Sequence, residues 1–510
     1  MLHPLTSKHI MFSLLSLVLL LLSLSACSTS PDNGHTTTPT TTSTSISALP
    51  AAGNCVKLTP HAQPPYANIQ VSHDTYLAHS EPMLAENPRN PLNLVGGSKF
   101  FTDPAHYKFQ IGYFASFDGG CTWTDGGVLQ GFPSGVLTSD ISFAFGTHND
   151  VYAAVLNTGA HEGNGITVWT STNGGKTFGP PVSVFLDKTG RVFSDKPWIA
   201  VDQTSGPHRG SIYVVWSYDH GGDCGSGNSC SEELAFSRST DGGKTFSPVR
   251  LVEGNAPFCT NPATGRPANS TKCDAVQGAI PVVEPDGTLA IATPYIDLMS
   301  GSIPTRMFVT TSPDGGTDWT SPVLIATIHD VAGTFPPDKY RNVSLPAFAC
   351  DPKTGQLYFS WSDKGTGDAD ILLATSEDGG KTWGAPVRVN DDPLRNGENQ
   401  FQPQLAVAPD GVVSVSFFDT RNDPHHRLID VYLAQSIDHG ASFLNDVRVT
   451  NQSWDPTIDA PVDTSGLQFI GDYQGLAADD QFVHPFWNDT RTGKQEIFTA
   501  AVPSVQPARS

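Results

Sequence analysis

The chain has 510 residues, which is enough for one large repeat domain or two domains of ordinary size. It carries 50 acidic and 29 basic residues and a formal net charge of −21, which excludes nucleic acid as an expected partner because phosphate binding needs positive charge. The acidic excess favours solubility and disfavours a broad surface for polyanions, while a local basic pocket stays compatible with it.

Residues 1–26 have the features of a bacterial signal peptide. Lys8 and His9 form a weakly basic start, and residues 10–24 form an apolar run that is too short for a membrane span. The four residues from Leu24 to Cys27 then resemble a lipobox, in which cleavage precedes the cysteine and the cysteine receives the lipid. We therefore expect an exported, cell-surface lipoprotein anchored to the membrane through Cys27 alone. The alternative, an ordinary secretory signal ending at Ala26, also implies export.

Residues 27–60 are expected to form a disordered tether behind the lipidated cysteine. They are rich in Ser, Thr and Pro and have no hydrophobic periodicity, so they cannot bury a core. The folded domain is expected to cover residues 61–505.

The remaining cysteines allow disulfides, because an exported protein meets an oxidising compartment. Candidate pairs are Cys224 with Cys230, Cys259 with Cys273, and Cys55 with Cys121, although spacing alone does not fix the pairing. Cys350 lies within an apolar strand and is expected to be a buried free thiol. The absence of paired CxxC motifs and histidine clusters predicts no metal centre.

Six copies of a short turn, the Asp box with the pattern S-x-D-x-G-x-T-[WF], follow along the domain. At the Asp position the copies carry Asp118, Asn173, Asp241, Asp314, Asp378 and Asp438. Each follows an apolar, β-branched run, as expected for a strand that enters a tight turn. The carboxylate can accept backbone N–H groups, the glycines allow positive φ, and the final aromatic residue packs between sheets. We interpret the boxes as structural, because a catalytic site would tolerate Asn173 poorly.

The sequence of each unit that contains a box predicts four short strands, a pattern that is typical of a β-propeller. In one unit the first strand covers residues 197–202 and the second covers residues 212–219. A further unit begins after the sixth box, at residues 475–489, and ends where a seventh box would start. Residues 68–74 resemble the missing fourth strand and would leave no open edge. The prediction is an all-β, seven-bladed propeller that the N-terminal strand closes in its last blade.

Residues 68–501 resemble the BNR/Asp-box proteins of the sialidase (neuraminidase) superfamily, whose sialidases have six blades. The resemblance implies a site of three arginines that bind the substrate carboxylate, a tyrosine nucleophile activated by a glutamate, and an aspartate as acid/base. The first arginine of that family lies in an R-I-P motif before the first strand. In this chain the matching stretch is Ser80-Glu81-Pro82, so an acid stands near the expected arginine.

The connections that enter the first strands and leave the second strands share one face of a propeller, and the boxes lie on the other. The first face is therefore where we expect a site. Before the first strands it receives Glu81, Asp195, Lys196, Gln277, Arg341, Gln402, Asp472 and Tyr473. After the second strands it receives Asp219, Asp363, Asp419, Arg421, Asp489 and Arg491.

If the protein is an enzyme, Tyr473 beside Asp472 is the first candidate nucleophile and Tyr340 the second. Asp195 and Glu81 are candidate acids. The substrate-binding candidates are Arg341, Arg421, Arg491, Asp419, Asp489 and Lys196. In the structural interpretation, each Asp of the two DTR motifs caps its turn and the Arg pairs with it or with a neighbouring blade.

The sequence favours binding of a glycan or a cell-surface protein without catalysis. The alternative is a sialidase-like exo-glycoside hydrolase with a rearranged site, and a third possibility is another propeller enzyme such as a lyase. No cofactor is expected, although carboxylates and carbonyls on this face are compatible with structural Ca²⁺. A lone propeller is compatible with a monomer.

Overall fold

The computed structural model describes residues 62–133, 135–159, 163–220, 231–252, 254–260, 270–296, 304–335 and 340–506. The predicted signal peptide, the whole tether with Cys27 and Cys55, and also Cys224 and Cys230 lie outside these residues. Within the described ranges, no helix is long and apolar enough to cross a membrane.

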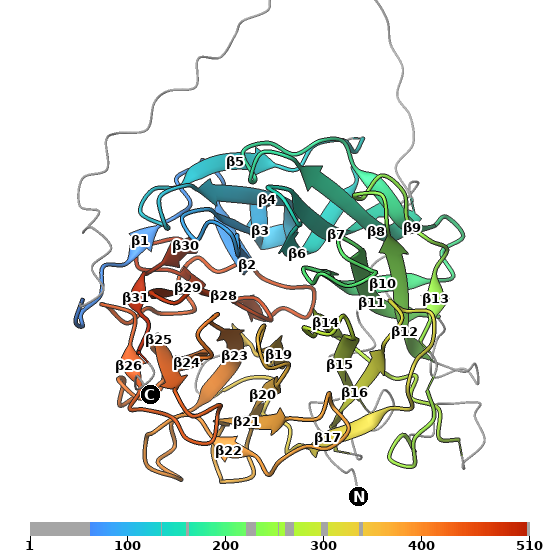
Figure 1. Ribbon diagram of the computed structural model, residues 1–510. Coiled ribbons are helices and arrows are strands. Elements are labelled where there is room, and N and C mark those ends of the chain that lie inside the picture. Colours follow the sequence, from blue (N-terminus) through green and yellow to red (C-terminus); the bar gives the residue numbers. More distant parts are fainter. Residues whose placement is uncertain are drawn as a thin grey trace, which may run out of the picture.

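Among the described residues, all strands except the separate pair β18 and β27 form seven sheets arranged in a ring around a central axis (Figure 1). The predicted all-β, seven-bladed propeller is thus confirmed. In the first six blades, four antiparallel strands follow one another in chain order. The first strand of each blade borders the central channel and the fourth lies at the rim.

The first three blades are built as follows. Blade I contains β2 (Ala78–Glu86), β3 (Leu94–Asp103), β4 (Lys108–Ser116) and β5 (Thr124–Val128). Blade II contains β6 (Leu137–Phe145), β7 (Val151–Gly159), β8 (Gly163–Ser171) and β9 (Val182–Asp187). Blade III contains β10 (Phe193–Val201), β11 (Ile212–Asp219), β12 (Glu232–Ser239) and β13 (Arg250–Leu251).

The next three blades repeat this order. Blade IV contains β14 (Ile280–Val283), β15 (Leu289–Tyr295), β16 (Arg306–Ser312) and β17 (Val323–Thr327). Blade V contains β19 (Ala347–Cys350), β20 (Leu357–Asp363), β21 (Asp370–Ser376) and β22 (Val387–Arg388). Blade VI contains β23 (Gln400–Val407), β24 (Val413–Asp419), β25 (Asp430–Ser436) and β26 (Val447–Arg448).

Blade VII combines both ends of the described chain. Its strands β28 (Gly475–Ala478), β29 (Phe482–Asp489) and β30 (Glu496–Thr499) come from the C-terminal end, and β31 (Val502–Pro503) pairs with β29. Its outer strand β1 (Ile69–Gln70) pairs antiparallel with β30. The Val71 N–H extends this pairing by donating to the Ile497 carbonyl at 2.7 Å. Closure by the N-terminal strand therefore occurs as the sequence predicts.

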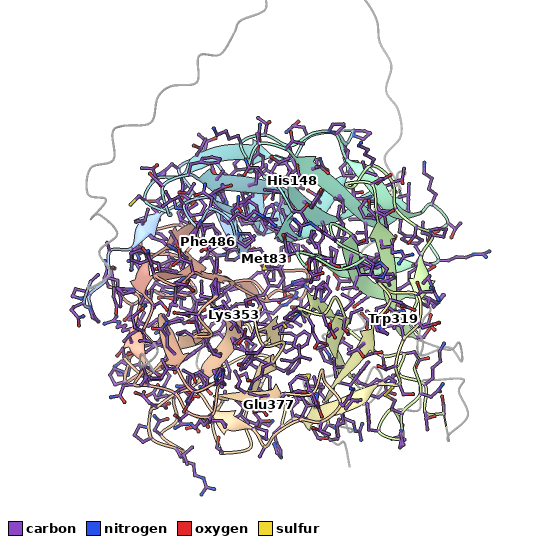
Figure 2. The ribbon with its side chains drawn as sticks, in the orientation of Figure 1. Met83, His148, Trp319, Lys353, Glu377 and Phe486 are labelled. Carbon is purple, nitrogen blue, oxygen red and sulfur yellow. A yellow bond between two sulfur atoms is a disulfide. The ribbon has the colours of Figure 1, made fainter. Side chains whose placement is uncertain are left out.

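Apolar side chains fill the seams between blades, with Met83 near the centre of the ring and Trp319 towards its periphery (Figure 2). At the seam of blades VII and I, the buried Phe486 ring lies against the backbone of Gly96. A Cβ added to Gly96 would come within 2.5 Å of this ring, so glycine is required for the close approach. Burial of one such phenylalanine contributes about 2 kcal/mol.

The repeated turns have the geometry that their sequence predicts. In the first copy, Asp118 Oδ1 accepts the Thr122 N–H at 2.9 Å, and the Thr122 hydroxyl donates to Asp118 Oδ2 at 2.6 Å. The Trp123 ring packs on Phe486 of the preceding blade at 5.5 Å between ring centroids. These bonds and contacts join each turn to the blade seams, as expected for a structural role.

Cys259 and Cys273 form a disulfide, as the sequence predicts. Cys121 is also disulfide-bonded, and its predicted partner Cys55 lies outside the described residues. Cys350 is a free thiol, but it is half-buried because its strand lies against a seam rather than deep in the core.

Candidate functional site

The first strands of four blades share one irregularity near the predicted functional face. Their pairing shifts register at Ser80/Met83, Ser139/Ile141, Asp195/Trp198 and Phe401/Gln404. At each shift one non-glycine residue has positive φ: Glu81 (52°), Asp140 (49°), Lys196 (49°) and Gln402 (50°). A β-bulge re-aims a side chain, and left-handed conformations of this kind concentrate at functional sites.

Three of these four re-aimed side chains meet in a buried charged cluster that also contains Asp472. The Lys196 ammonium donates to Asp140 Oδ1 and to Asp472 Oδ2, both at 2.9 Å, and lies 3.5 Å from Glu81 Oε1. These partners belong to blades I, II and VII, while Lys196 belongs to blade III. The contacts therefore span the axis of the ring. We call Glu81, Lys99, Asp140, Lys196, Arg341 and Asp472 the axial cluster.

Lys99, on β3, adds a second buried cation by pairing with Glu81 Oε2. Its ammonium lies 4.7 Å from the ring centroid of Phe109 and 4.8 Å from that of Phe469. Cation–π attraction and the Glu81 carboxylate together replace the water that Lys99 loses on burial.

Arg341 enters the axial cluster from a short parallel pairing of β18 (Tyr340–Arg341) with β27 (Gln468–Phe469). Its Nη2 donates to Asp472 Oδ2 at 2.5 Å, and Nη1 lies 3.5 Å from Asp463 Oδ2. The guanidinium also lies 5.0 Å from the centroid of the Phe469 ring. One carboxylate, Asp472, therefore accepts hydrogen bonds from both Lys196 and Arg341.

Tyr473 lies against the same cluster and is only 2% exposed. Its hydroxyl lies 3.5 Å from Asp140 Oδ1, and the Lys196 ammonium lies 5.5 Å from its ring centroid. Burial, followed by the negative charges of Glu81 and Asp140, raises the pKa of Tyr473 well above its usual range. The phenol is therefore neutral and would need a base to become a nucleophile.

Asp195 lies beside the cluster and receives a hydrogen bond of 3.2 Å from Gln277 Nε2. Burial raises the pKa of Asp195 to about 7, against the opposing effect of Lys196. Asp472 behaves in the opposite way: burial opposes its ionisation, but Arg341 and Lys196 hold its pKa well below the usual range. The site thus contains one carboxyl that can exchange a proton near neutral pH and one that stays ionised.

The other two predicted arginines lie elsewhere. Arg421 accompanies Asp419 (2.8 Å) and reaches Asp391 and Asp446 at 2.6 and 2.8 Å, which joins blades V and VI. Burial raises the pKa of Asp419 to about 7 despite this arginine. The structure therefore does not bring Arg421 together with Tyr473.

Arg491 repeats this arrangement at the seam of blades VI and VII. It donates to Asp489 Oδ2 at 2.6 Å, to Asn451 Oδ1 at 2.6 Å and to Asn68 Oδ1 at 2.9 Å. Each DTR aspartate also accepts the backbone N–H two residues later, at 2.7 Å for Asp419 and 2.8 Å for Asp489. The two motifs cap their turns and fasten blade seams, and a convergent arginine clamp is not formed.

Sequence reasoning missed Asp140 and Lys99. Asp140 carried a usable signal, because it stands at the same place in its first strand as Glu81 and Lys196 do in theirs. Lys99 had none, since it is a single lysine in an otherwise apolar strand. It becomes part of the site only through its contact with Glu81.

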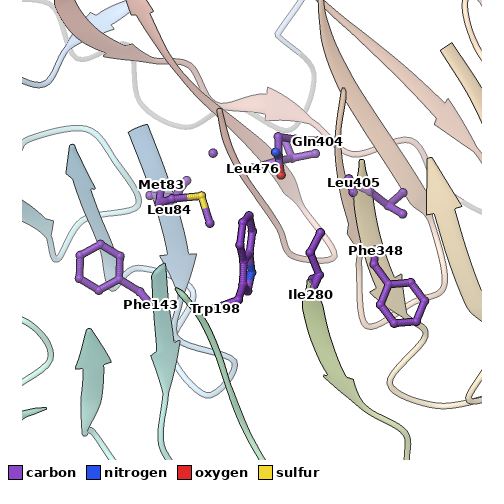
Figure 3. A pocket seen from close by; sticks show the side chains of 11 residues that line it. Met83, Leu84, Phe143, Trp198, Ile280, Phe348, Gln404, Leu405 and Leu476 are labelled. Atoms are coloured by element: carbon purple, nitrogen blue, oxygen red, sulfur yellow. The ribbon is translucent and has the colours of Figure 1, made fainter. Parts of the chain in front are cut away.

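A cavity of about 130 Å³ lies among the first strands of the blades (Figure 3). Its lining comes from the first strands of the blades, with Met83, Phe143, Trp198, Ile280 and Phe348 around it. Met83 and Trp198, which line this cavity, stand two residues beyond Glu81 and Lys196 in their strands. Trp198 is also partly exposed and contacts Tyr473 at 5.9 Å between ring centroids.

No protein-family model matches the chain, and no curated protein is similar to it in sequence. Among solved structures, a protein of unknown function from Dyadobacter fermentans has 16% identity and a TM-score of 0.47 over 74% of this chain and 98% of its own. A Hadza microbial sialidase has 15% identity and a TM-score of 0.43 over 81% and 75%. The phage phi92 endosialidase has 11% identity and a TM-score of 0.45 over 87% and 70%. The chain is thus similar to these solved structures only at low identity.

Proposed function

We propose that this propeller is a binding module of an exported lipoprotein, and that it takes a glycan or cell-surface protein ligand on the face opposite the repeated turns. One observation carries the proposal: the three candidate arginines do not converge. Arg421 and Arg491 are bonded into two separate blade seams, and Arg341 is already paired with Asp472 and Asp463.

The charge of the axial cluster supports the same conclusion. Its cations Lys99, Lys196 and Arg341 each pair with a carboxylate within the protein. An anionic sugar would have to displace one of these carboxylates, at the cost of leaving it buried and unpaired. A neutral glycan or a protein segment meets no such barrier and could pack on the partly exposed Trp198 beside the channel.

A glycoside hydrolase with a rearranged site is the second candidate, because one observation favours it. The Tyr473 hydroxyl lies 3.5 Å from the Asp140 carboxylate, which is the arrangement of a phenol nucleophile with its base. Asp195, with a pKa of about 7, would serve as the acid/base.

A glycan array and a fluorogenic sialoside assay on the same purified protein separate the two candidates. We expect saturable binding without turnover. Tyr473→Phe should leave binding within about two-fold, as should the matched control Tyr213→Phe in the buried core of blade III. Turnover of the sialoside by the parent protein and by Tyr213→Phe, but not by Tyr473→Phe, would contradict the binding-module proposal and support the enzyme.

Anchoring through Cys27 and a monomeric state belong to the same proposal. Cys27→Ala should move the protein from the membrane fraction to the soluble exported fraction. Light scattering on the purified protein should give the mass of one chain, and a larger mass would contradict the monomer.

A further inference from the structure

A second polar group lies in the seam between blades VII and I, at the face of the repeated turns. It consists of Glu86 at the end of β2, Asp479 in the turn between β28 and β29, and His484 on β29. One ligand atom from each residue lies within 4.8 Å of the other two. These strands adjoin in the ring (Figure 1), so the group joins the last blade to the first.

Within this group His484 is buried and Glu86 and Asp479 are half-buried, and His484 and Glu86 lack hydrogen-bond partners among the described residues. His484 is only 2% exposed, and its side chain makes no hydrogen bond to another described residue. Glu86 Oε2 is buried and likewise has no hydrogen-bond partner among the described residues. Burial of an imidazole or a carboxylate without a hydrogen-bond partner is energetically unfavourable unless a ligand provides the missing interaction.

The surrounding backbone shapes the site around His484. Asp479 Oδ1 caps its own turn by accepting the N–H groups of Gln481 and Phe482 at 2.5 and 2.7 Å, which fixes the carboxylate in place. Gly120 of the first repeated turn covers the imidazole, since a Cβ there would lie 3.6 Å from His484 Nδ1. Thus the Asp479 carboxylate is held by its turn and the His484 imidazole is covered by Gly120, and both lie within reach of Glu86.

We propose that Glu86, Asp479 and His484 bind a first-row divalent cation of the zinc type, with solvent as the fourth ligand. One imidazole nitrogen and two carboxylate oxygens suit such an ion, whereas Ca²⁺ prefers six to eight oxygens. Donor atoms around tetrahedral zinc lie roughly 3.3 Å apart, given bonds of about 2.0 Å. The separations between these donor atoms, which reach up to 4.8 Å, therefore need to shorten by up to about 1.5 Å to bind the ion.

The bound ion would fasten the seam that separates the end of the domain from its beginning. Because the ligands come from blade I and blade VII, metal binding would oppose separation of these blades. This role differs from that of the axial cluster, which lies at the other face, and it does not depend on the proposed ligand-binding function.

The test uses the purified chain after chelation and exchange into metal-free buffer, titrated with Zn²⁺ alone. We expect one ion per chain by elemental analysis, a Kd in the micromolar range or tighter by calorimetry, and a rise in Tm on binding. Glu86→Gln and His484→Gln should each weaken binding at least ten-fold, while the exposed control His148→Gln leaves the Kd unchanged.

Co²⁺ gives an independent readout that a folding defect cannot imitate. The Co²⁺ complex should show the intense visible absorption of a four-coordinate ion, and Glu86→Gln, which keeps the side-chain volume, should abolish it while far-UV circular dichroism stays unchanged. No Zn²⁺ binding at 100-fold molar excess, or equal binding by the Glu86→Gln and His484→Gln variants, would overturn the proposal. Binding of Ca²⁺ in preference to Zn²⁺ would overturn it as well.

Discussion

Lys196 is the residue whose removal should disturb the axial cluster most, because it faces three carboxylates from three other blades. We predict that Lys196→Met lowers the free energy of unfolding by about 3–5 kcal/mol at pH 7, as expected when a buried charge loses its partner. Chemical denaturation checks this value. The exposed control Lys244→Met, in a repeated turn, should change stability by less than about 0.5 kcal/mol.

The pH dependence of the stability of Lys196→Met follows from the direction in which the pKa values of the neighbouring carboxylates are shifted. The carboxylates Asp140 and Asp472 have lowered pKa values, despite opposing burial, because of neighbouring cations that include Lys196. Their stabilising contribution is present above the unfolded pKa of about 4 and is lost as pH falls through the folded value. Without Lys196 these pKa values rise, so the deficit of Lys196→Met should shrink between pH 7 and pH 5. A deficit that does not change with pH would contradict this electrostatic explanation.

A second prediction concerns the repeated turns. The Thr245 hydroxyl and N–H donate to Asp241 and lower its pKa to about 2. In the second turn Asn173 already accepts the Thr177 N–H at 3.0 Å and donates to its hydroxyl at 2.8 Å. We therefore expect Asp241→Asn to be nearly neutral at pH 7 and Asp241→Ala to cost about 1 kcal/mol, by denaturant titration.

Acid should separate these two variants from the parent protein. A lowered folded pKa stabilises the protein above the unfolded value of about 4, and this contribution disappears as pH falls through about 2. Thermal melts should thus show Asp241→Asn close to the parent at pH 7 and at least as stable as the parent at pH 2.5, where the parent has lost part of the carboxylate contribution. Equal losses in Asp241→Asn and Asp241→Ala at pH 7 would mean that the carboxylate charge, and not the hydrogen-bond geometry, holds the turn.

At the scale of the strand, the β-bulges of the first strands allow two contributions to stability to be measured separately. One is the side-chain hydrogen bond, and the other is backbone strain at positive φ. Gln402 has φ 50° and its Nε2 donates to the Gly471 carbonyl at 2.7 Å. Both Gln402→Gly and Gln402→Val lose this bond, but only valine is strained at positive φ. We predict that the valine variant is less stable than the glycine variant by about 1–3 kcal/mol, by denaturant titration. Equal stability would show that the bulge relaxes on substitution.

The separation in sequence between interacting residues explains which predictions from sequence succeed. The repeated turn is a local structure whose hydrogen bonds join residues two to four positions apart, as between Ser116, Asp118 and Thr122, so its sequence is sufficient to identify it. The axial cluster depends on pairs as distant as Lys196 and Asp472, which only the closed ring brings together. Nothing local distinguishes Arg341, which reaches the axis, from Arg421, which stays in a seam. The face of the propeller that carries the site could therefore be predicted from the sequence, whereas the residues that form the site could not.

For the whole molecule, closure by β1 predicts where truncation becomes harmful. Asn68 donates to the Val449 carbonyl at 2.9 Å and accepts from Arg491 at 2.9 Å, which ties the start of blade VII to blade VI. Removal of residues 1–54, which keeps Cys55 as the predicted disulfide partner of Cys121, should leave Tm unchanged within about 1 °C. Removal of residues 1–74 should lower Tm by roughly 5 °C or more, since an outer strand and its seam contacts are lost.

The double substitution Asn68→Ala with Arg491→Ala in the full chain is a control that leaves the chain length unchanged. It should reproduce part of the Tm loss of the longer truncation, whereas Arg421→Ala, at the separate seam of blades V and VI, should add its own loss to that of removing β1. An unchanged Tm after removal of residues 1–74 would show that the other strands of blade VII hold the ring closed without it.

Because one sheet contains both ends of the described chain, the ring itself has no preferred starting point. Circular permutation should therefore be tolerated: a linker from Pro503 to Asn68, with new termini in another turn at the rim, would preserve the strand pairings of all seven blades. The cyclic order of the blades, and not the position at which synthesis begins, is what this architecture requires.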